Sequence, residues 1–170
     1  VNIVWLSSRV LGSDLCSTTQ TQLASGLVSK GHTVDFYSPG KSVANTFNHH
    51  SIERSNRRGF QARSVVRNLH EHLDDINSAD VVLIDWSIFS IADKIKPNVV
   101  LIDRGPPADN GILAKLQWRP WRKAWSKADK GTTVSPAHSR FVMEGTKFTE
   151  KSIQEIPAGV NLESFTPSKK

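Results

Sequence analysis

The sequence has a single cysteine, Cys16, among its 170 residues. A disulfide bond within the chain is therefore impossible, and a reducing cytoplasm fits this composition best. No apolar run approaches the ~20 residues that a membrane-spanning helix requires. The Cys-x-x-Cys and His-Glu-x-x-His spacings typical of zinc sites do not occur either, so we expect no metal site.

Two common phosphate-binding fingerprints are also missing from the sequence. It contains neither the Gly-x-Gly-x-x-Gly motif of dinucleotide-binding folds nor a Walker loop. The loop after the first predicted strand, residues 7–17, holds one glycine, Gly12. This loop leads into a helix whose first N–H groups favour a phosphate or carboxylate, and the alternative is a plain strand-to-helix turn.

Positive charge, in contrast, is in excess. Lys and Arg number 22 against 16 Asp and Glu, which gives a formal net charge of +6. This balance favours anionic partners, namely phosphates, nucleotides, nucleic acid or an acidic membrane surface. Simple solubility explains a charge of this size equally well.

Short apolar runs alternate with helix-like segments along the chain. The predicted strands are 2–8, 32–39, 51–54, 80–85, 98–103, 131–135 and 151–157, and the predicted helices are 18–31, 61–79, 88–97, 111–129 and 136–145. Strands that are apolar throughout are typical of a parallel sheet covered on both faces. We therefore predict an α/β fold, a Rossmann-like three-layer domain over residues 1–166, with a linker beginning near 167. Pro120 is expected to kink or split the fourth helix.

In a sheet of this kind, ligands bind beyond the carboxyl ends of the strands. That rule selects the loop 7–17, Asp85, Asp103 and Ser135. A carboxylate such as Asp103 is suited to orient a hydroxyl or act as a base, whereas Asp85 is better explained as the cap of a turn. Arg104 stands beside a stiff Gly-Pro-Pro turn and is suited to meet a phosphate.

The segment "WRPWRKAW" concentrates tryptophans and cations. It could anchor the chain at a lipid interface, stack on nucleic acid, or form a core helix with a basic outer side. The core interpretation has half the weight, because Trp121 and Trp125 lie four residues apart on the apolar stripe. For a peripheral contact with the inner face of a membrane, the candidate residues are Trp118, Arg119, Trp121, Arg122 and Trp125.

Several motifs occur in an ordered set along the chain. A Gly-His-x-Val element follows the first helix, Ala-Asp precedes a strand that ends in Ser135, and Pro-x-Gly-Val-Asn-x-x-x-Phe-x-Pro closes the chain at 157–167. In this order they resemble the N-terminal domain of the family-four retaining glycosyltransferases, which have the GT-B fold. The resemblance covers nearly the whole chain except residues 40–80, which carry no motif.

The resemblance implies the acceptor-binding half of an enzyme that moves a sugar, of the hexosyltransferase type, from a nucleotide sugar to an acceptor hydroxyl. The donor half, marked by a Glu-x₇-Glu motif, would follow the linker, so the isolated domain is expected to be inactive. Glu155 and Glu163 have this spacing but flank the Pro-x-Gly turn, and we treat the match as chance. The resemblance implies no cofactor besides the nucleotide-sugar substrate.

Carried over residue by residue, the resemblance implies substrate contacts at Gly12, Ser13 and Asp14, the position of the family's glycine loop. Many members have a histidine at the end of the strand before the long helix, where this chain has Asp103 and Arg104. The identity of any catalytic base is therefore open, with Asp103 as the candidate. Two other hypotheses remain: a stand-alone nucleotide-binding Rossmann-like module, and a basic domain that binds membranes or nucleic acid.

Overall fold

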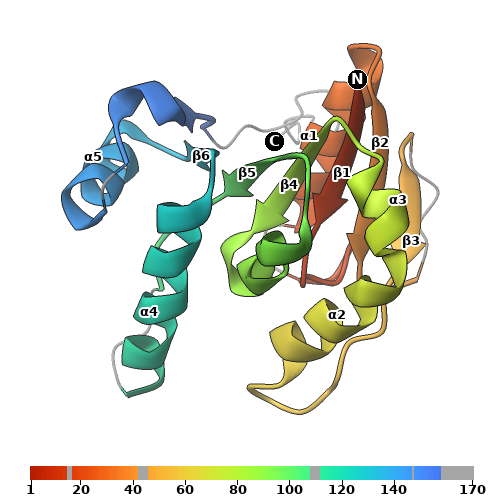
Figure 1. Cartoon of the computed structure of the whole chain (residues 1–170), viewed down its shortest axis with the longest axis horizontal. Helices are drawn as coiled ribbons and strands as arrows, with labels where there is room; N and C mark the ends of the chain where they lie inside the picture. The colour runs from red at the N-terminus through yellow and green to blue at the C-terminus, as the bar shows by residue number, and fades with distance from the viewer. Residues whose placement is uncertain (15–16, 42–45, 108–111, 147, 158–170) are drawn as a thin grey trace, which may run out of the picture.

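The computed structural model of the chain describes residues 1–14, 17–41, 46–107, 112–146 and 148–157 (Figure 1). Its centre is a seven-stranded sheet in the order β3-β2-β1-β4-β5-β6-β7, in which every pair is parallel. The strands are β1 (Asn2–Leu6), β2 (Thr33–Ser38), β3 (Asn48–Ser51), β4 (Val81–Asp85), β5 (Asn98–Ile102), β6 (Lys130–Thr133) and β7 (Ile153–Glu155). The predicted parallel α/β architecture is confirmed.

The helical segments match the predicted order but differ in detail. They are α1 (Ser17–Ser29), α2 (Gln61–Leu69), η1 (His70–His72), α3 (Leu73–Asn77), η2 (Trp86–Lys94), α4 (Ile112–Lys127), α5 (Pro136–Gly145) and η3 (Glu150–Ser152), where η marks a 3₁₀ helix. The predicted helix 61–79 is thus divided into three pieces. The predicted split at Pro120 is wrong: α4 continues through it, because the buried residues that follow hold the helix against the sheet.

The third strand lies three residues earlier than predicted. It carries Asn48, His49 and His50, which have no apolar strand signal. These residues form a strand because β2 offers partners: Asp35 accepts hydrogen bonds from Asn48 Nδ2 at 3.3 Å and His50 Nε2 at 2.7 Å. An edge strand satisfied by polar side chains leaves no apolar periodicity to detect.

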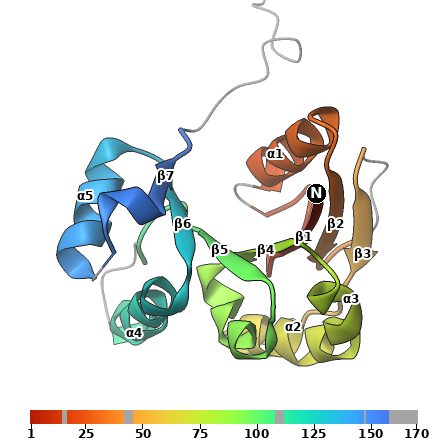
Figure 2. The same cartoon turned by 45° about the horizontal axis from the view of Figure 1, so that its top comes forward.

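The sheet is covered on both faces. Figure 2 shows α1 on one face and α2, α3 and α4 on the other. Alternate residues of each strand feed two separate cores. Ile3, Trp5, Val34 and Phe36 pack with Ala24 of α1, whereas Val4, Leu6, Val82, Ile84 and Leu101 pack with the helices of the opposite face. This two-sided burial is why the strands read as continuous apolar runs.

One strand position has no room for a side chain. A Cβ atom on Gly131 of β6 would lie 2.2 Å from Cζ3 and 2.5 Å from Cη2 of the Trp125 ring, which extends from α4 to the strand. Trp125 is fully buried, so it cannot move aside without disturbing its neighbours. The glycine is therefore required by packing and not by backbone conformation.

We predict that Gly131→Ala lowers the free energy of unfolding by about 1–3 kcal/mol, because the added methyl group overpacks the core. The matched control is Gly26→Ala in α1, where a Cβ meets nothing within 4 Å. That change should raise stability by about 0.5–1 kcal/mol, since alanine favours the helix. Urea unfolding followed by circular dichroism measures both, and equal effects of the two changes would contradict the packing argument.

Candidate substrate site at the carboxyl edge of the sheet

The strand order reverses between β1 and β4, so the topological switch point lies there. Two hydrogen bonds cross it. Ser7 Oγ, just after β1, donates to Asp85 Oδ2 at the end of β4 over 2.5 Å. One residue farther on, the Ser8 and Ser87 hydroxyls lie 2.8 Å apart. The switch point is thus closed by short polar contacts between the two loops that flank it.

Asp85 is a buried carboxylate that accepts hydrogen bonds from Ser7, which follows β1, and from Gln20 of α1. Gln20 Nε2 of α1 donates to its two oxygens, each at 3.1 Å, and the same amide lies 3.2 Å from Ser7 Oγ. Burial raises the pKa of the Asp85 carboxyl above its ordinary value of 3.8; the hydrogen bonds of Ser7 and Gln20 and the charges of Arg9 and Arg104 act in the opposite direction. Asp85 stands at the N-cap position of η2, but its side chain makes no capping hydrogen bond there. The predicted turn-cap role is therefore wrong, and the carboxylate instead ties α1 to the sheet.

The loop between β1 and α1 contains the three residues matched to the family's glycine loop. Gly12 has a positive φ of 81° and is exposed, and its N–H donates to Ser17 Oγ at 3.2 Å. Ser13 is exposed. Asp14 Oδ2 accepts from the Val10 N–H at 2.9 Å and from Arg54 Nη1 at 2.8 Å. Asp14 thus braces the loop, while Gly12 and Ser13 face outward.

Asp103 lies at the end of β5 and is 1% exposed. Its Oδ2 accepts from the indole N–H groups of Trp121 at 2.6 Å and Trp125 at 2.8 Å, and its Oδ1 accepts from the Gly105 N–H at 3.0 Å. His138 Nε2 lies 3.4 Å from the same Oδ2. The protein's own donors therefore surround this carboxylate, which favours a positioning role over the catalytic role predicted from the sequence.

Arg104 follows directly and has a different environment. Arg104 as a whole is half-buried, but its Nε atom is fully buried and has no hydrogen-bond partner among the described residues. Its charge acts to lower the pKa of Asp85, against the larger opposing effect of burial. Gly105, with φ of 146°, turns the chain immediately after it. The turn that Asp103 fixes through Gly105 therefore carries a cation with unused donor capacity.

Ser135 directly precedes α5, whose bounds Pro136–Gly145 match the predicted helix 136–145. Its hydroxyl accepts from the His138 N–H at 3.2 Å and caps α5. His138 Nδ1 lies 3.5 Å from the Val134 N–H, and its Nε2 faces Asp103. His138 therefore connects two predicted site residues, Ser135 and Asp103, that lie on neighbouring strand ends.

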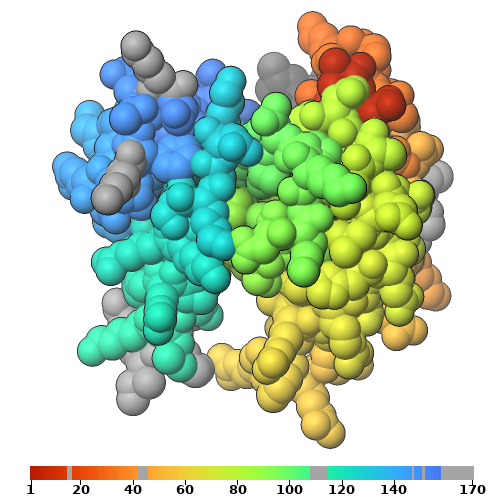
Figure 3. Space-filling model, in the orientation of Figure 1, coloured from red at the N-terminus to blue at the C-terminus, as the bar shows by residue number. Residues whose placement is uncertain are grey.

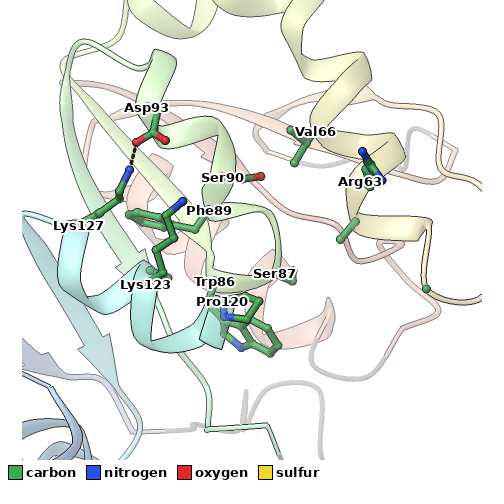
Figure 4. A pocket seen from close by; sticks show the side chains of 13 residues that line it. Arg63, Val66, Trp86, Ser87, Phe89, Ser90, Asp93, Pro120, Lys123 and Lys127 are labelled. Atoms are coloured by element: carbon green, nitrogen blue, oxygen red, sulfur yellow. Dashed lines mark hydrogen bonds and ion pairs between the residues drawn. The ribbon is translucent and has the colours of Figure 1, made fainter. Parts of the chain in front are cut away.

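A groove opens beside this edge, between α2 and α4 (Figure 3). Its volume is about 320 Å³ and its floor is η2. Figure 4 shows the side chains that line it from all three segments. Ser87 belongs to this lining and also contacts Ser8, so the groove is continuous with the β1–α1 loop.

The structure of the tryptophan segment corrects the predicted membrane contact. Trp121 and Trp125 are fully buried and bonded to Asp103, so they cannot enter a lipid interface. Trp118 is half-buried against Trp121 and Phe141, with ring centroids 5.5 and 5.8 Å away. The core interpretation of this helix is the correct one for the two central tryptophans. Of the predicted membrane-contact set, Arg119 and Arg122 are exposed.

The described part of the chain contains neither a candidate membrane span nor a candidate metal-binding cluster. None of its helices combines the length and apolar character needed to cross a membrane. Within the same residues, no group of three or more His, Cys, Asp and Glu side chains is arranged to hold a metal ion. The closing motif from Gly159 onward and the linker near 167 lie outside the described residues.

Sequence reasoning missed the roles of Gln20, Arg54 and His138. Gln20 had a detectable signal, since it is a polar residue on the face of α1 that packs against the sheet. Arg54 and His138 had none, because their partners lie 40 and 35 residues away in the sequence. Such contacts depend on which strand ends the fold brings together.

The raised pKa of Asp85 predicts a pH-dependent stability difference. A carboxyl whose pKa is raised by folding contributes stability that is present below pH 3.8 and lost as the pH rises through the folded-state pKa. Asp85→Asn removes that loss while keeping hydrogen-bonding atoms toward Ser7 and Gln20. Relative to the parent, the variant should therefore gain unfolding free energy as the pH rises from 3.5 to 8, measured by urea unfolding.

Asp93→Asn is the control of opposite sign. The hydrogen bond from Lys127 lowers the pKa of the exposed Asp93 carboxyl. That contribution is present above pH 3.8 and lost as the pH falls, so this variant should lose stability relative to the parent as the pH rises. A pH-independent difference for Asp85→Asn would contradict the assignment of Asp85.

The buried cluster predicts a large cost for removing its acceptor. Asp103→Ala leaves the two indole N–H groups buried without a partner and should lower the unfolding free energy by about 2–5 kcal/mol. Asp129→Ala is the matched control, because its exposed carboxylate accepts one bond, from the Val99 N–H at 2.9 Å. It should cost about 1 kcal/mol. Near-ultraviolet circular dichroism reports the tryptophans, and an unchanged spectrum in Asp103→Ala would count against the cluster.

Known structures resemble this fold over nearly its whole length. Sucrose-phosphate synthase from Thermosynechococcus elongatus aligns over 98% of this chain and 50% of its own, with a TM-score of 0.76 and 12% identity. WaaG, a glycosyltransferase involved in lipopolysaccharide biosynthesis, aligns over 94% and 45%, with a TM-score of 0.69 and 13% identity. A UDP-N-acetylglucosamine 2-epimerase aligns over 91% and 47%, with a TM-score of 0.61 and 9% identity. The chain thus spans about half the length of these proteins, and the likeness shows the fold alone.

The sequence itself decides between the classes that share this fold. A comparison with curated proteins found no match. The family model described as Glycosyltransferase Family 4, however, matches residues 17–164, which is most of the chain. The resemblance predicted from the ordered motifs is therefore confirmed, and the chain belongs to glycosyltransferase family 4.

Proposed function

We propose that this chain is the acceptor-binding half of a retaining glycosyltransferase, which moves a hexose from a nucleotide sugar to an acceptor hydroxyl. The observation that carries the proposal is the 2.8 Å contact between Ser8 and Ser87. It joins the β1–α1 loop, which the family resemblance places near the donor phosphates and the acceptor, to the groove between α2 and α4. An acceptor in the groove would present its hydroxyl at the edge where the sugar arrives.

Arg104 is the proposed contact for the departing diphosphate. Its charge acts on Asp85, which ends β4 at the switch point, and its buried Nε has no partner among the described residues. A fixed cation of this kind stabilises the negative charge that develops as the bond from sugar to phosphate breaks. The exposed Gly12 and Ser13 and the half-buried Ser135 complete the proposed substrate contacts along the same edge.

Asp103 supports this site without touching the substrate in our proposal. It fixes the Gly105 N–H and thereby the turn that carries Arg104. It also links that turn to α4 through two indoles and lies beside His138 of α5. A cation that is already in position stabilises the departing diphosphate with less reorganisation than a flexible one. We propose that Asp103 contributes by holding Arg104 in that position.

The chemistry proposed for this edge needs no side-chain base. In a retaining transfer, the acceptor hydroxyl attacks on the face from which the diphosphate leaves, and the departing phosphate oxygen accepts the hydroxyl proton. The protein then contributes orientation and charge stabilisation. We further propose that the donor is held mainly by residues outside this sequence, so that these 170 residues alone transfer no sugar.

The test compares the chain alone with a longer chain that includes the residues encoded downstream. Each is incubated with UDP-glucose, GDP-glucose or ADP-glucose and a panel of acceptors, and the released nucleoside diphosphate is measured. We expect turnover only from the longer chain, with the anomeric configuration of the donor kept in the product. In that chain, Arg104→Gln should lower kcat/KM by about 10- to 100-fold, as for the loss of one charge-assisted contact.

Arg119→Gln is the control, because this exposed arginine is on α4 outside the edge and should change kcat/KM less than about twofold. Turnover by the 170-residue chain alone would overturn the division of labour. A product of inverted configuration would overturn the retaining mechanism. An equal effect of both substitutions would remove Arg104 from the proposed site.

A further inference from the structure

The groove between α2 and α4 combines an apolar floor with unmatched positive charge. Phe89 and Ala124 are buried at its base, and Val66 and Trp86 are half-buried in its walls. Pro120 adds an apolar surface at the rim, and it has no N–H to hydrogen-bond a ligand. A groove of about 320 Å³ with this lining suits a small apolar body.

Charge is arranged around that floor with one sign in excess. Arg63 on α2 and Lys123 on α4 line opposite walls, and both are exposed (Figure 4). Neither has an ion pair within 4.0 Å among the described residues. The one carboxylate in the lining, Asp93, is paired with Lys127, and the charge of Lys123 also acts on it. The lining therefore sets three cations, Arg63, Lys123 and Lys127, against a single carboxylate.

The two helices that border the groove strengthen this imbalance. α2 and α4 contain arginines and lysines but no Asp or Glu. Repulsion between cations on facing walls is relieved when an anion lies between them. The charge pattern therefore points to a ligand that brings negative charge into the groove, not to a neutral sugar.

We propose that this groove binds a single amphiphilic molecule, a phosphate ester whose apolar chain lies on the Phe89 floor and whose phosphate lies between Arg63 and Lys123. Where the proposed function holds, this molecule is the sugar acceptor, because Ser87 makes the groove continuous with the β1–α1 loop. The inference rests on the proposed function for that role alone.

Binding to the 170-residue chain tests the groove without any turnover. The probes are octyl phosphate and octyl glucoside, both below their critical micelle concentrations, and inorganic phosphate. Isothermal titration calorimetry measures the affinity of the chain for each. We expect saturable binding of octyl phosphate that is about tenfold or more tighter than that of either other probe, because only it supplies both the chain and the charge. Equal affinity for octyl glucoside would overturn the role of charge, and equal affinity for inorganic phosphate the role of the apolar floor.

Two matched double variants locate the charge. R63Q/K123Q should weaken octyl phosphate binding by about tenfold or more, whereas R67Q/R122Q removes the same charge from the same helices outside the groove and should weaken it less than about threefold. Equal losses in the two variants would overturn the site. Ser90→Phe adds bulk to the groove without changing its charge and should weaken octyl phosphate binding; an unchanged affinity in this variant would also overturn it.

Three further outcomes separate this inference from its alternatives. Sedimentation with phosphatidylglycerol vesicles without saturable octyl phosphate binding would overturn the proposal, since it would assign these cations to a membrane surface. Groove-dependent octyl phosphate binding by a chain whose longer form transfers no sugar would support the groove and reject the proposed function. Sugar transfer to neutral acceptors alone, unchanged in R63Q/K123Q, would support the function and reject the groove.

Discussion

Every strand of this domain runs in the same direction, and the arrangement of the site depends on that constraint. A parallel sheet places all carboxyl ends at one edge, so residues far apart in the sequence meet there. Ser7 and Asp85 are 78 positions apart and share a 2.5 Å hydrogen bond. The strand order reverses between β1 and β4, and the two loops that flank this bond meet again one residue farther on, where the Ser8 and Ser87 hydroxyls lie 2.8 Å apart.

The two strand-end aspartates serve the protein itself. Asp85 is bonded to Ser7 and Gln20, and Asp103 to two indoles and a backbone N–H. Burying these carboxylates costs free energy, and several donors to each offset that cost. Arg104, in contrast, has a buried Nε without a hydrogen-bond partner among the described residues. An edge whose carboxylates are internally satisfied is suited to phosphate chemistry, which agrees with a family that handles activated sugars.

The groove between α2 and α4 extends this electropositive edge along one face. The sheet is covered there by two helices that do not touch along their length, with η2 as the floor between them (Figures 3 and 4). The helix on one wall holds its place through Trp121 and Trp125, so the same buried cluster that positions Arg104 also fixes the wall that carries Lys123. The turn that carries Arg104 and the groove wall that carries Lys123 are thus connected through Asp103.

The sequence by itself determined the class of fold and the family, and it predicts a site at the strand ends. Continuous apolar runs and glycine turns are local signals, and they survive in a single sequence because each strand must be buried on both faces. The tertiary structure alone decided which polar residues meet. The partners of Asp14 and Asp103 come from Arg54 and from α4, and the polar strand Asn48–Ser51 exists only because β2 satisfies it. These pairings depend on strand order and helix packing, which bring distant residues within hydrogen-bond distance and leave no periodic trace in the chain.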